Sequence, residues 1–361
     1  MWLVVAGEPS GDRTLAAVVR ASGARSFGIG GEALAAAGTE LLAHVRDLSG
    51  MGLFELGARA PAIARALAAL VARVRRSPPE RAVLCSWSTG NARLGAWLRG
   101  RGIPVTWVSP PEVWAHRGGR LPRLARAADR FVPTLPFEVA LWRSAGADAH
   151  YVGHPSLDVP IPERPERLAS IAVLPGSRPA EIERLLPRFV EAVRLLAPLD
   201  ARVVRAPSLP RRSLELLERC GLPLVTVDPR VGASGLLPSF DVALVASGTA
   251  SLEAAVAGVP PIVAYALHPL TYAIARRLVD VSHVALPNVV LVRSGQSPVF
   301  SERLQDAAAP AILAADLRRA LADRPRLRAA AAAVRAALDP GTSRSFAEGA
   351  AALVDATVPL G

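Results

Sequence analysis

The sequence predicts an α/β fold made of two doubly wound halves, and three observations support this. Strand-like and helix-like segments alternate along all 361 residues, a pattern typical of parallel sheets covered by helices. Glycine-containing turns follow several of the strand-like runs. A proline-rich stretch at residues 155–165 separates the halves. We therefore expect one domain over residues 1–155, a second over 156–340, and a last helix at 341–361 that joins the first domain.

The first half opens with a strand, a short loop and a helix, the usual first unit of a doubly wound sheet. Short apolar runs predict the strands, and longer Ala- and Leu-rich runs ended by Gly or Pro predict the helices. The expected strands lie at residues 2–6, 27–32 (with its loop), 81–85, 105–108, 130–132 and 149–152, and the expected helices at 14–21, 61–73 and 92–99.

The second half repeats this alternation. Because ligands of doubly wound sheets bind beyond the carboxyl ends of the strands, we expect the site in a central cleft where the loops of both halves gather. The expected strands lie at residues 170–174, 201–206, 224–227 and 242–245, and the expected helices at 180–196, 252–257 and 318–338.

The composition excludes several classes of protein. Apolar residues make up 51% of the chain, which is enough for two cores and too much for a disordered protein. The formal net charge is +11 and the chain has Arg but no Lys, so we expect anionic partners and no lysine Schiff base or phosphate-loop lysine. With 5% aromatic residues and no aromatic–basic strand pattern, we expect no nucleic acid partner.

We predict neither a metal site nor a cofactor site. Cys85 and Cys220 lack metal-binding spacing and provide no disulfide framework. Gly7 and Gly11 do not complete the G-x-G-x-x-G fingerprint of a dinucleotide site. The opening apolar run is too short for a signal peptide, and arginines interrupt the longest apolar stretch. We therefore expect a cytoplasmic protein without a membrane span.

A turn of small residues at 247–250 stands between a buried strand and a helix. Backbone N–H groups at a helix start have no intrahelical partner and lie at the positive end of the helix dipole, so this geometry favours phosphate. Small side chains also let a diphosphate approach the backbone closely. The residues assigned to this site are Ser247, Gly248, Thr249 and Ala250.

A second turn, formed by Gly176, Ser177 and Arg178, follows another strand of the same half. The guanidinium of Arg178 can bind a diphosphate through two hydrogen bonds. Two doubly wound halves with such turns suggest a nucleotide-sugar glycosyltransferase. A sugar-nucleotide epimerase and a two-domain binding protein remain open alternatives at this point.

Several loops together resemble those of one family, the lipid-A-disaccharide synthases, in order and over nearly the whole chain. Each motif is short, but the colinear set is specific. The matching segments are residues 6–12 (AGEPSGD), 28–31 (GIGG), 51–56 (MGLFEL), 108–110 (VSP), 113–115 (VWA), 135–138 (LPFE), 152–155 (VGHP), 174–178 (LPGSR), 246–250 (ASGTA), 252–254 (LEA), Tyr265 and 286–288 (LPN).

The resemblance implies a GT-B type glycosyltransferase with two Rossmann-like domains. Such an enzyme transfers a 2,3-diacylglucosamine unit from UDP to 2,3-diacylglucosamine 1-phosphate, with inversion and without a metal. It implies a UDP-sugar held by the second domain and an acylated sugar phosphate held by the first, at the inner face of the membrane. A homodimer stays open. Besides the two turns, the implied substrate-binding residues are Gly7, Glu8, Ser10, Gly11, Asn91, Glu253, Asn288 and Gln305.

The chain departs from the family where the catalytic base is expected. The family's loop there reads approximately Asp-Ala-Pro-Asp-Phe-Asn, whereas residues 86–91 read Ser-Trp-Ser-Thr-Gly-Asn. Thr89 occupies the position of the base and cannot accept a proton at neutral pH. In the next loop Glu112 and His116 are candidates for a relocated base, and Asp12 and Glu8 in the first loop are further candidates.

This departure keeps three functions open: the synthase itself, a homologue that binds a UDP-sugar or lipid phosphate with little transfer, and a transferase of the same fold with another acceptor. The arginine-bearing helix at residues 61–73 and its flanks fit either an anionic membrane surface or an ordinary core-facing helix.

Overall fold

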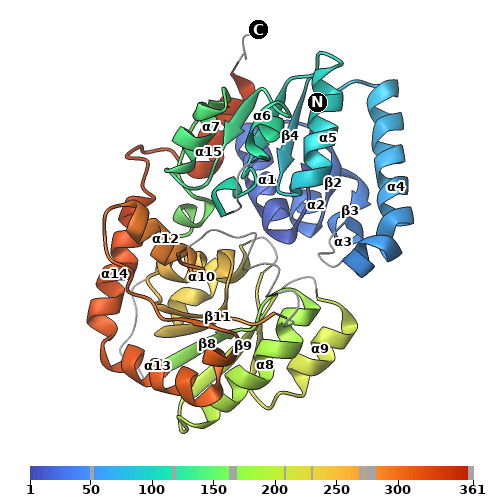
Figure 1. The fold of residues 1–361 in the computed structure, drawn as a ribbon. Coiled ribbons are helices and arrows are strands. Elements are labelled where there is room, and N and C mark those ends of the chain that lie inside the picture. Colours follow the sequence, from blue (N-terminus) through green and yellow to red (C-terminus); the bar gives the residue numbers. More distant parts are fainter. Residues whose placement is uncertain are drawn as a thin grey trace. The chain divides into compact units, whose positions relative to one another are not determined.

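The structure is a computed structural model. It describes residues 1–48, 53–115, 119–161, 169–206, 209–228, 231–267, 272 and 282–356, except for the side chains of 47, 48 and 53–59. The chain forms two compact units. The first comprises Met1–Asp158 and Pro340–Gly361, and the second comprises Val159–Asp339. Each unit is a parallel sheet covered by helices on both faces (Figure 1).

The sheet of the first unit has seven strands in the order β3-β2-β1-β4-β5-β6-β7. Every pairing is parallel. Apart from Arg81 at the start of β4, the central strands β1 and β4 are apolar because helices bury both of their faces. The strands are β1 (Trp2–Ala6), β2 (Ser26–Gly30), β3 (Glu40–His44), β4 (Arg81–Cys85), β5 (Val105–Val108), β6 (Arg130–Val132) and β7 (Asp148–Ala149).

Two apolar layers hold the helices of this unit against its sheet. One layer joins alternate strand residues, such as Leu3 and Val5, to α4 (Leu53–Arg76), α5 (Ser88–Arg99), α6 (Leu121–Ala125) and α7 (Glu138–Ser144). The other layer joins the intervening strand residues to α1 (Pro9–Ser22), α2 (Glu32–Ala36) and α15 (Phe346–Asp355). Three short helices, α3 (Val45–Leu48), η1 (Val113–Ala115) and η2 (Pro155–Asp158), complete the unit.

Helix α15 returns from the far end of the chain to pack beside α1 in the first unit. The carboxylate of Asp158 accepts hydrogen bonds from the backbone N–H groups of Phe346 (2.8 Å) and Ala347 (3.2 Å) at the start of α15. At its other end, the guanidinium groups of Arg81 and Arg130 donate to carbonyl oxygens of the last turn. Both ends of α15 are therefore satisfied by residues of the first unit.

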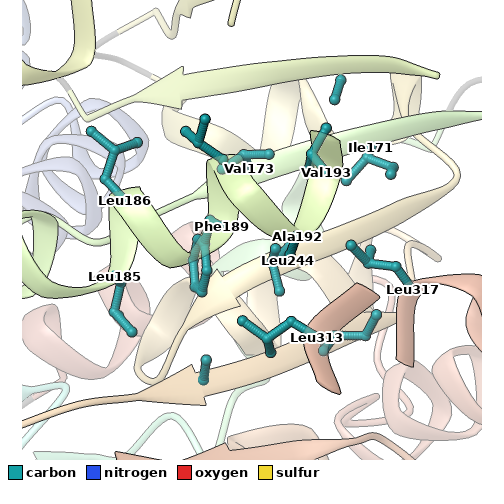
Figure 2. Packing of buried hydrophobic residues seen from close by; sticks show 14 of the residues in the cluster. Ile171, Val173, Leu185, Leu186, Phe189, Ala192, Val193, Leu244, Leu313 and Leu317 are labelled. Carbon is teal, nitrogen blue, oxygen red and sulfur yellow. The ribbon is translucent and has the colours of Figure 1, made fainter. Parts of the chain in front are cut away.

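The sheet of the second unit has six parallel strands in the order β10-β9-β8-β11-β12-β13. The strands are β8 (Ser170–Leu174), β9 (Asp200–Arg205), β10 (Leu224–Thr226), β11 (Val242–Ala246), β12 (Pro261–Tyr265) and β13 (Glu302–Leu304). Figure 2 shows one side of the core, where Leu185 and Phe189 of the helix at Pro179–Arg194 belong to the same apolar cluster as Val173 and Leu244 of the sheet.

On that face, the helices α8 (Pro179–Arg194), α9 (Arg211–Glu218) and α13 (Pro310–Ala322) pack on the sheet. On the opposite face, α10 (Thr249–Val256) packs on the sheet, and α12 (Leu286–Arg293) and α14 (Arg324–Ala337) contact α10. The short helices η3 (Gly232–Gly235), η4 (Leu237–Ser239) and η5 (Gln305–Ala308) lie in the connections.

Several elements differ from the sequence predictions. Helices α1 and α5 begin at Pro9 and Ser88, so part of each expected loop is a first helical turn. The expected helix at 318–338 is two helices with Asp323 between them, and the last helix begins only at Phe346. The strand expected at 149–152 is reduced to a short β7. The strands β3, β12 and β13 were not predicted.

Candidate active site

The strand order of the second unit brings together the two turns that are predicted to bind phosphate. The strands β8 and β11 lie side by side at the centre of the sheet, and the strands that follow them in the chain, β9 and β12, lie on opposite sides of this pair. Because β8 and β11 are parallel, the connections that follow them leave at the same edge of the sheet. Leu174 pairs with Val245 in their register, and each turn follows its strand directly. Such a reversal point is where ligands bind in doubly wound sheets.

The turn after β8 is built around a buried carboxylate. Gly176 has φ +113°, and a Cβ there would lie 2.6 Å from Oε2 of Glu181, so only glycine fits. Arg178 precedes α8, and its Nη1 donates to Oε1 of Glu181 at 2.9 Å. The side chain of Arg178 is 41% exposed, so its guanidinium can still meet a ligand. Ser177, between them, is exposed.

The turn after β11 leads into α10. Ser247 donates its hydroxyl hydrogen to the carbonyl oxygen of Val284 at 2.7 Å, and its backbone N–H donates to the carbonyl oxygen of Ala264 at 3.0 Å. Gly248 has φ +144°, and a Cβ at this position would meet no atom within 4 Å. Open space therefore adjoins the helix start. Thr249 and Ala250 form the first residues of α10, where backbone N–H groups are available to an anion.

Two further predicted binding residues of this unit, Glu253 and Gln305, make contacts within the protein. Glu253 is 8% exposed, and Oγ of Ser234 donates to its Oε2 at 3.3 Å. Gln305 exchanges two amide hydrogen bonds with the backbone of Leu267, at 2.7 and 3.1 Å. These contacts give Glu253 and Gln305 fixed positions.

Asn288 is buried, and its amide is fully used. Its Nδ2 donates to the carbonyl oxygen of Phe300 (2.8 Å) and to Oε1 of Glu302 (2.6 Å), and its Oδ1 accepts from the backbone N–H groups of Val299 and Phe300. The side chain therefore joins α12 to the segment before β13. Asn288 would therefore affect a ligand only by holding this segment in place.

In the first unit, the corresponding reversal lies between β1 and β4. Their connections are in close contact. The N–H of Gly7 donates to the carbonyl oxygen of Cys85 at 3.1 Å, and a Cβ on Gly7 would lie 2.1 Å from Cβ of Trp87. Gly11 lies against Cys85 and Ser86 in the same way. Both glycines are thus needed for close approach of the two connections.

Glu8 and Ser10 lie at the start of α1 in this region. Glu8 is its N-cap residue and has extended backbone, and the carbonyl oxygen of Ser10 accepts a hydrogen bond from the hydroxyl of Thr14 at 3.0 Å. Both side chains are half-buried.

The connection after β4, which carries Thr89, has an unusual backbone. Ser86 (φ 56°) and Trp87 (φ 44°) are left-handed, as is Ser109 (φ 49°) at the end of the neighbouring β5. Residues other than glycine adopt this conformation at a cost, and such residues cluster at functional sites. Thr89 lies in the first turn of α5 and is exposed.

Asn91 lies two residues beyond Thr89 and is fully buried. Its Nδ2 donates to the carbonyl oxygens of Cys85 and Ser86, both at 3.0 Å, and so supports the left-handed backbone. Within the described part of the chain, its Oδ1 has no hydrogen-bond partner.

Glu112 lies in the loop after β5 and is an exposed residue. The surrounding protein reduces the hydration of its carboxylate and Glu8 repels it, and together these effects raise the pKa of Glu112 to about 7. A carboxyl group with a pKa near neutrality suits a proton acceptor. His116, the other candidate in this loop, lies outside the described residues.

Glu138 positions the end of the same loop. It is 1% exposed, and burial, together with the charge of Glu112, raises its pKa well above the usual range of a carboxyl group. Nε1 of Trp114 donates to its Oε1 at 3.1 Å, and the N–H of Leu135 donates to its Oε2 at 3.3 Å. Trp114 also meets the ring of Phe137 edge-on, at 5.6 Å between centroids. The position of Trp114 is therefore fixed by two contacts.

Asp12, the third candidate base, has a different role in the structure. It is 4% exposed, and its carboxylate accepts hydrogen bonds from the backbone N–H groups of Gly31 (2.6 Å), Ala33 (3.0 Å) and Leu34 (3.3 Å). These donors belong to the start of α2. Asp12 therefore caps that helix and holds the loop after β2, and this geometry argues against a role as the base.

Two carboxylates, Glu181 and Glu138, were not predicted as site residues. Each lies at the start of a helix, where an acidic residue is ordinarily explained by the helix dipole. For Glu138 the available signal was its position inside the matching segment 135–138, whereas Glu181 lies three residues beyond the segment 174–178.

Solved structures of other proteins share this fold. The Acinetobacter baumannii MurG structure matches with a TM-score of 0.54 and 15% identity over 98% of both chains. The S. aureus MnaA–UDP structure matches with a TM-score of 0.63 and 13% identity, over 96% of this chain and 93% of that one. The two parallel sheets, each with its turns at the reversal point, have the architecture of the GT-B glycosyltransferases.

Sequence comparison gives the particular family. The lipid-A-disaccharide synthetase family matches residues 2–338. The lipid-A-disaccharide synthase of Anaeromyxobacter dehalogenans (strain 2CP-C) is 41% identical, over 96% of this chain and 95% of that protein. The Myxococcus xanthus (strain DK1622) enzyme of the same name is 38% identical, over 88% and 87%. The chain belongs to the lipid-A-disaccharide synthase family, as its motifs predict.

The described residues include no helix that is both long enough and apolar enough to cross a membrane. Among the same residues, no group of three or more His, Cys, Asp or Glu side chains is arranged to hold a metal ion.

Proposed function

We propose that this protein is a lipid-A-disaccharide synthase, which transfers a 2,3-diacylglucosamine unit from UDP to 2,3-diacylglucosamine 1-phosphate. The observation that carries the proposal is the pairing of β8 with β11, which brings Arg178 and the start of α10 to one edge of the sheet in a member of this family. A guanidinium and a helix N-terminus together suit a diphosphate.

In the proposed reaction, the acceptor hydroxyl oxygen attacks the anomeric carbon of the donor sugar with inversion. The bond from that carbon to UDP breaks, and its electron pair leaves with the diphosphate. Arg178 and the backbone N–H groups of Thr249 and Ala250 stabilise the charge that develops there. We propose that these groups serve in place of a metal ion.

We propose Glu112 as the acceptor of the hydroxyl proton. Thr89 carries no carboxylate, and Asp12 is used in capping α2. Glu112 is exposed, and its raised pKa suits proton transfer near neutral pH. Gly7, Glu8, Ser10, Gly11 and Asn91 would form and support the acceptor site around it.

The test is release of UDP from the diacylated donor, measured with and without the diacylated acceptor phosphate. Release that depends on the acceptor is expected from the wild-type protein, and it should fall at least about a hundredfold in Arg178→Ala. Absence of release from a folded protein that still binds UDP in isothermal titration contradicts a transferase.

Thr89 itself favours a second candidate function, which is a homologue that binds the UDP-sugar with little transfer. The family's base position lacks a carboxylate, while the turns of the second unit are intact. UDP binding without turnover is the outcome that this candidate predicts. Turnover with a different acceptor would instead indicate a transferase of the same fold with another substrate.

We also propose peripheral binding to an anionic membrane surface through α4. Its arginines Arg65, Arg75 and Arg76 are exposed, whereas Arg73 lies over the ring of Phe27 at 4.4 Å and belongs to the fold. Basic groups on one helix attract anionic lipid head groups. Binding to vesicles that contain anionic lipid should weaken as salt is added and should be reduced when these three arginines are replaced by Gln.

A further inference from the structure

Glu181 lies directly beneath the turn that carries Arg178. It belongs to the first turn of α8 and is 8% exposed. Its Oε1 accepts a hydrogen bond from Nη1 of Arg178 at 2.9 Å. A buried carboxylate beside a half-exposed guanidinium can fix the direction in which that guanidinium points.

The turn itself is shaped to receive this carboxylate. The backbone of Gly176 passes so close that a Cβ would lie 2.6 Å from Oε2 of Glu181 and 2.9 Å from its Cβ. Any larger residue at position 176 would displace the carboxylate from Arg178. The glycine and the glutamate therefore act as one unit, and Arg178 is the side chain that this unit holds.

Tyr265, at the end of β12, shares the same surroundings. Burial raises the pKa of its phenol, the Glu181 carboxylate raises it further, and Arg178 opposes them. Tyr265 therefore senses the charges on Glu181 and Arg178. Since β12 pairs with β11, the tyrosine lies at the edge of the sheet where both turns leave.

Loss of Glu181 would have two opposing effects on a bound diphosphate. It would remove a negative charge that repels the ligand, and it would release a long side chain that must then be ordered when the ligand binds. In the ground state these effects largely cancel. In the transition state, charge builds up on the leaving oxygen, and stabilisation requires a donor that is already oriented.

We propose that Glu181 is a positioning residue that holds the Arg178 guanidinium toward the leaving diphosphate. The inference rests on the proposed function, because it assigns Glu181 a part in that reaction. Glu181 does not touch the substrate and acts only through Arg178.

The experiment compares Glu181→Gln, Arg178→Ala and the double variant by steady-state UDP release. Gln keeps the size that the Gly176 turn requires and loses the charge. We expect kcat to fall about tenfold in Glu181→Gln, with the KM for the donor changed less than about threefold, and we expect no further fall when the change is added to Arg178→Ala. Glu181→Asp, whose carboxylate is too short for the contact, should behave like Glu181→Gln.

The matched control is Glu183→Gln on the same helix. Glu183 is 42% exposed and pairs with Arg212, away from the turn, so its kcat and KM should equal those of the wild type. An unchanged kcat in Glu181→Gln overturns the inference. So does an equal loss in the Arg178→Ala background, because Glu181 would then act independently of Arg178.

A second measurement separates this inference from the proposed function. The ionisation of Tyr265 can be followed by its absorbance during a pH titration, and Tyr265→Phe identifies its signal among the three tyrosines. The pKa of Tyr265 should be lower in Glu181→Gln and unchanged in Glu183→Gln. UDP should raise that pKa in the wild type by offsetting Arg178, and should raise it less in Glu181→Gln.

If the wild type is inactive but UDP still raises the pKa of Tyr265 more in the wild type than in Glu181→Gln, only the proposed function is refuted. If the UDP effect is equal in the two proteins, the positioning role is overturned whether or not the wild type turns over.

Discussion

The carboxylate of Asp12 accepts a hydrogen bond from the backbone N–H of Gly31 at 2.6 Å, across 19 residues of sequence. Through this bond the first turn of α1 holds the loop that follows β2. The same carboxylate also accepts from the N–H groups of Ala33 and Leu34. From the sequence alone, Asp12 could be either a catalytic base or a helix-capping residue. A base needs a free carboxylate oxygen, whereas both oxygens of Asp12 accept hydrogen bonds from the start of α2.

Asp12→Asn tests that separation. The amide offers one oxygen to three N–H donors and brings an N–H₂ group toward them, so we expect the free energy of unfolding to fall by about 1–3 kcal/mol. Denaturant unfolding measures this loss. The shape of the pH–rate profile should not change. Loss of its acid limb would instead assign Asp12 to proton transfer.

Glu8→Gln should move the pH dependence of transfer. Glu112 must be deprotonated to accept a proton, so kcat/KM is expected to rise with pH through about 7, the pKa to which its surroundings raise it, and to level off above. Because the Glu8 carboxylate contributes to this increase, removing its charge lowers the pKa of Glu112 and shifts the rising limb to lower pH.

Glu112→Gln is the companion variant. Glu112→Gln should abolish the rise of kcat/KM with pH and lower the rate of transfer by about 10²-fold or more. A limb that stays at the same pH in both variants contradicts Glu112 as the base.

Thr89→Asp should restore a carboxylate at the family's position. Thr89 lies in the first turn of α5, which contains no acidic residue, so an aspartate there is favoured by the helix dipole and should be tolerated. If the base has been lost, UDP release should increase well above the wild-type rate. Thr89→Asn, which lacks the charge, is the control and should give no increase.

Gly248→Ala should weaken UDP binding. A side chain strains a residue with φ +144° and would occupy the open space beside the start of α10. Gly38→Ala is a matched control, because Gly38 also has a positive φ (+84°) and open surroundings, but lies away from the turns.

Both substitutions should cost about 1–2 kcal/mol of stability. Only Gly248→Ala should raise the dissociation constant for UDP, measured by isothermal titration. An equal dissociation constant in the two variants would place the diphosphate elsewhere.

The sequence was sufficient to predict the central strands and the two turns of the second unit. Runs such as 242–245 and 171–174 are apolar at every position because both of their faces are covered, and this signal is local. The strand β3 was not predicted because Glu40 is exposed, the other strand residues are only partly buried, and the run carries a mixed pattern. The early start of α5 depends on the left-handed Trp87, which packs against Gly7 and Gly90.

The partners of the candidate site residues could not be predicted in the same way. Trp114 and Glu138 are 24 residues apart, and their contact exists only because neighbouring strands bring their loops together. Asn288 shows the same limit. Its motif indicates importance, but only the fold shows that its amide is bonded to the segment at 299–302. Residue type predicted where a turn could bind phosphate, and tertiary contacts decided which side chains remain available.

Helix α15 has a consequence for how the molecule is made. The layer beneath β1 and β4 includes Phe346 and Val354, so the first unit is interrupted in sequence by the whole of the second. During synthesis the ribosome must complete the second unit before the last part of the first is available. The emerging first unit therefore carries an uncovered apolar face until α15 arrives, and a chaperone that shields such surfaces would find it exposed through most of translation.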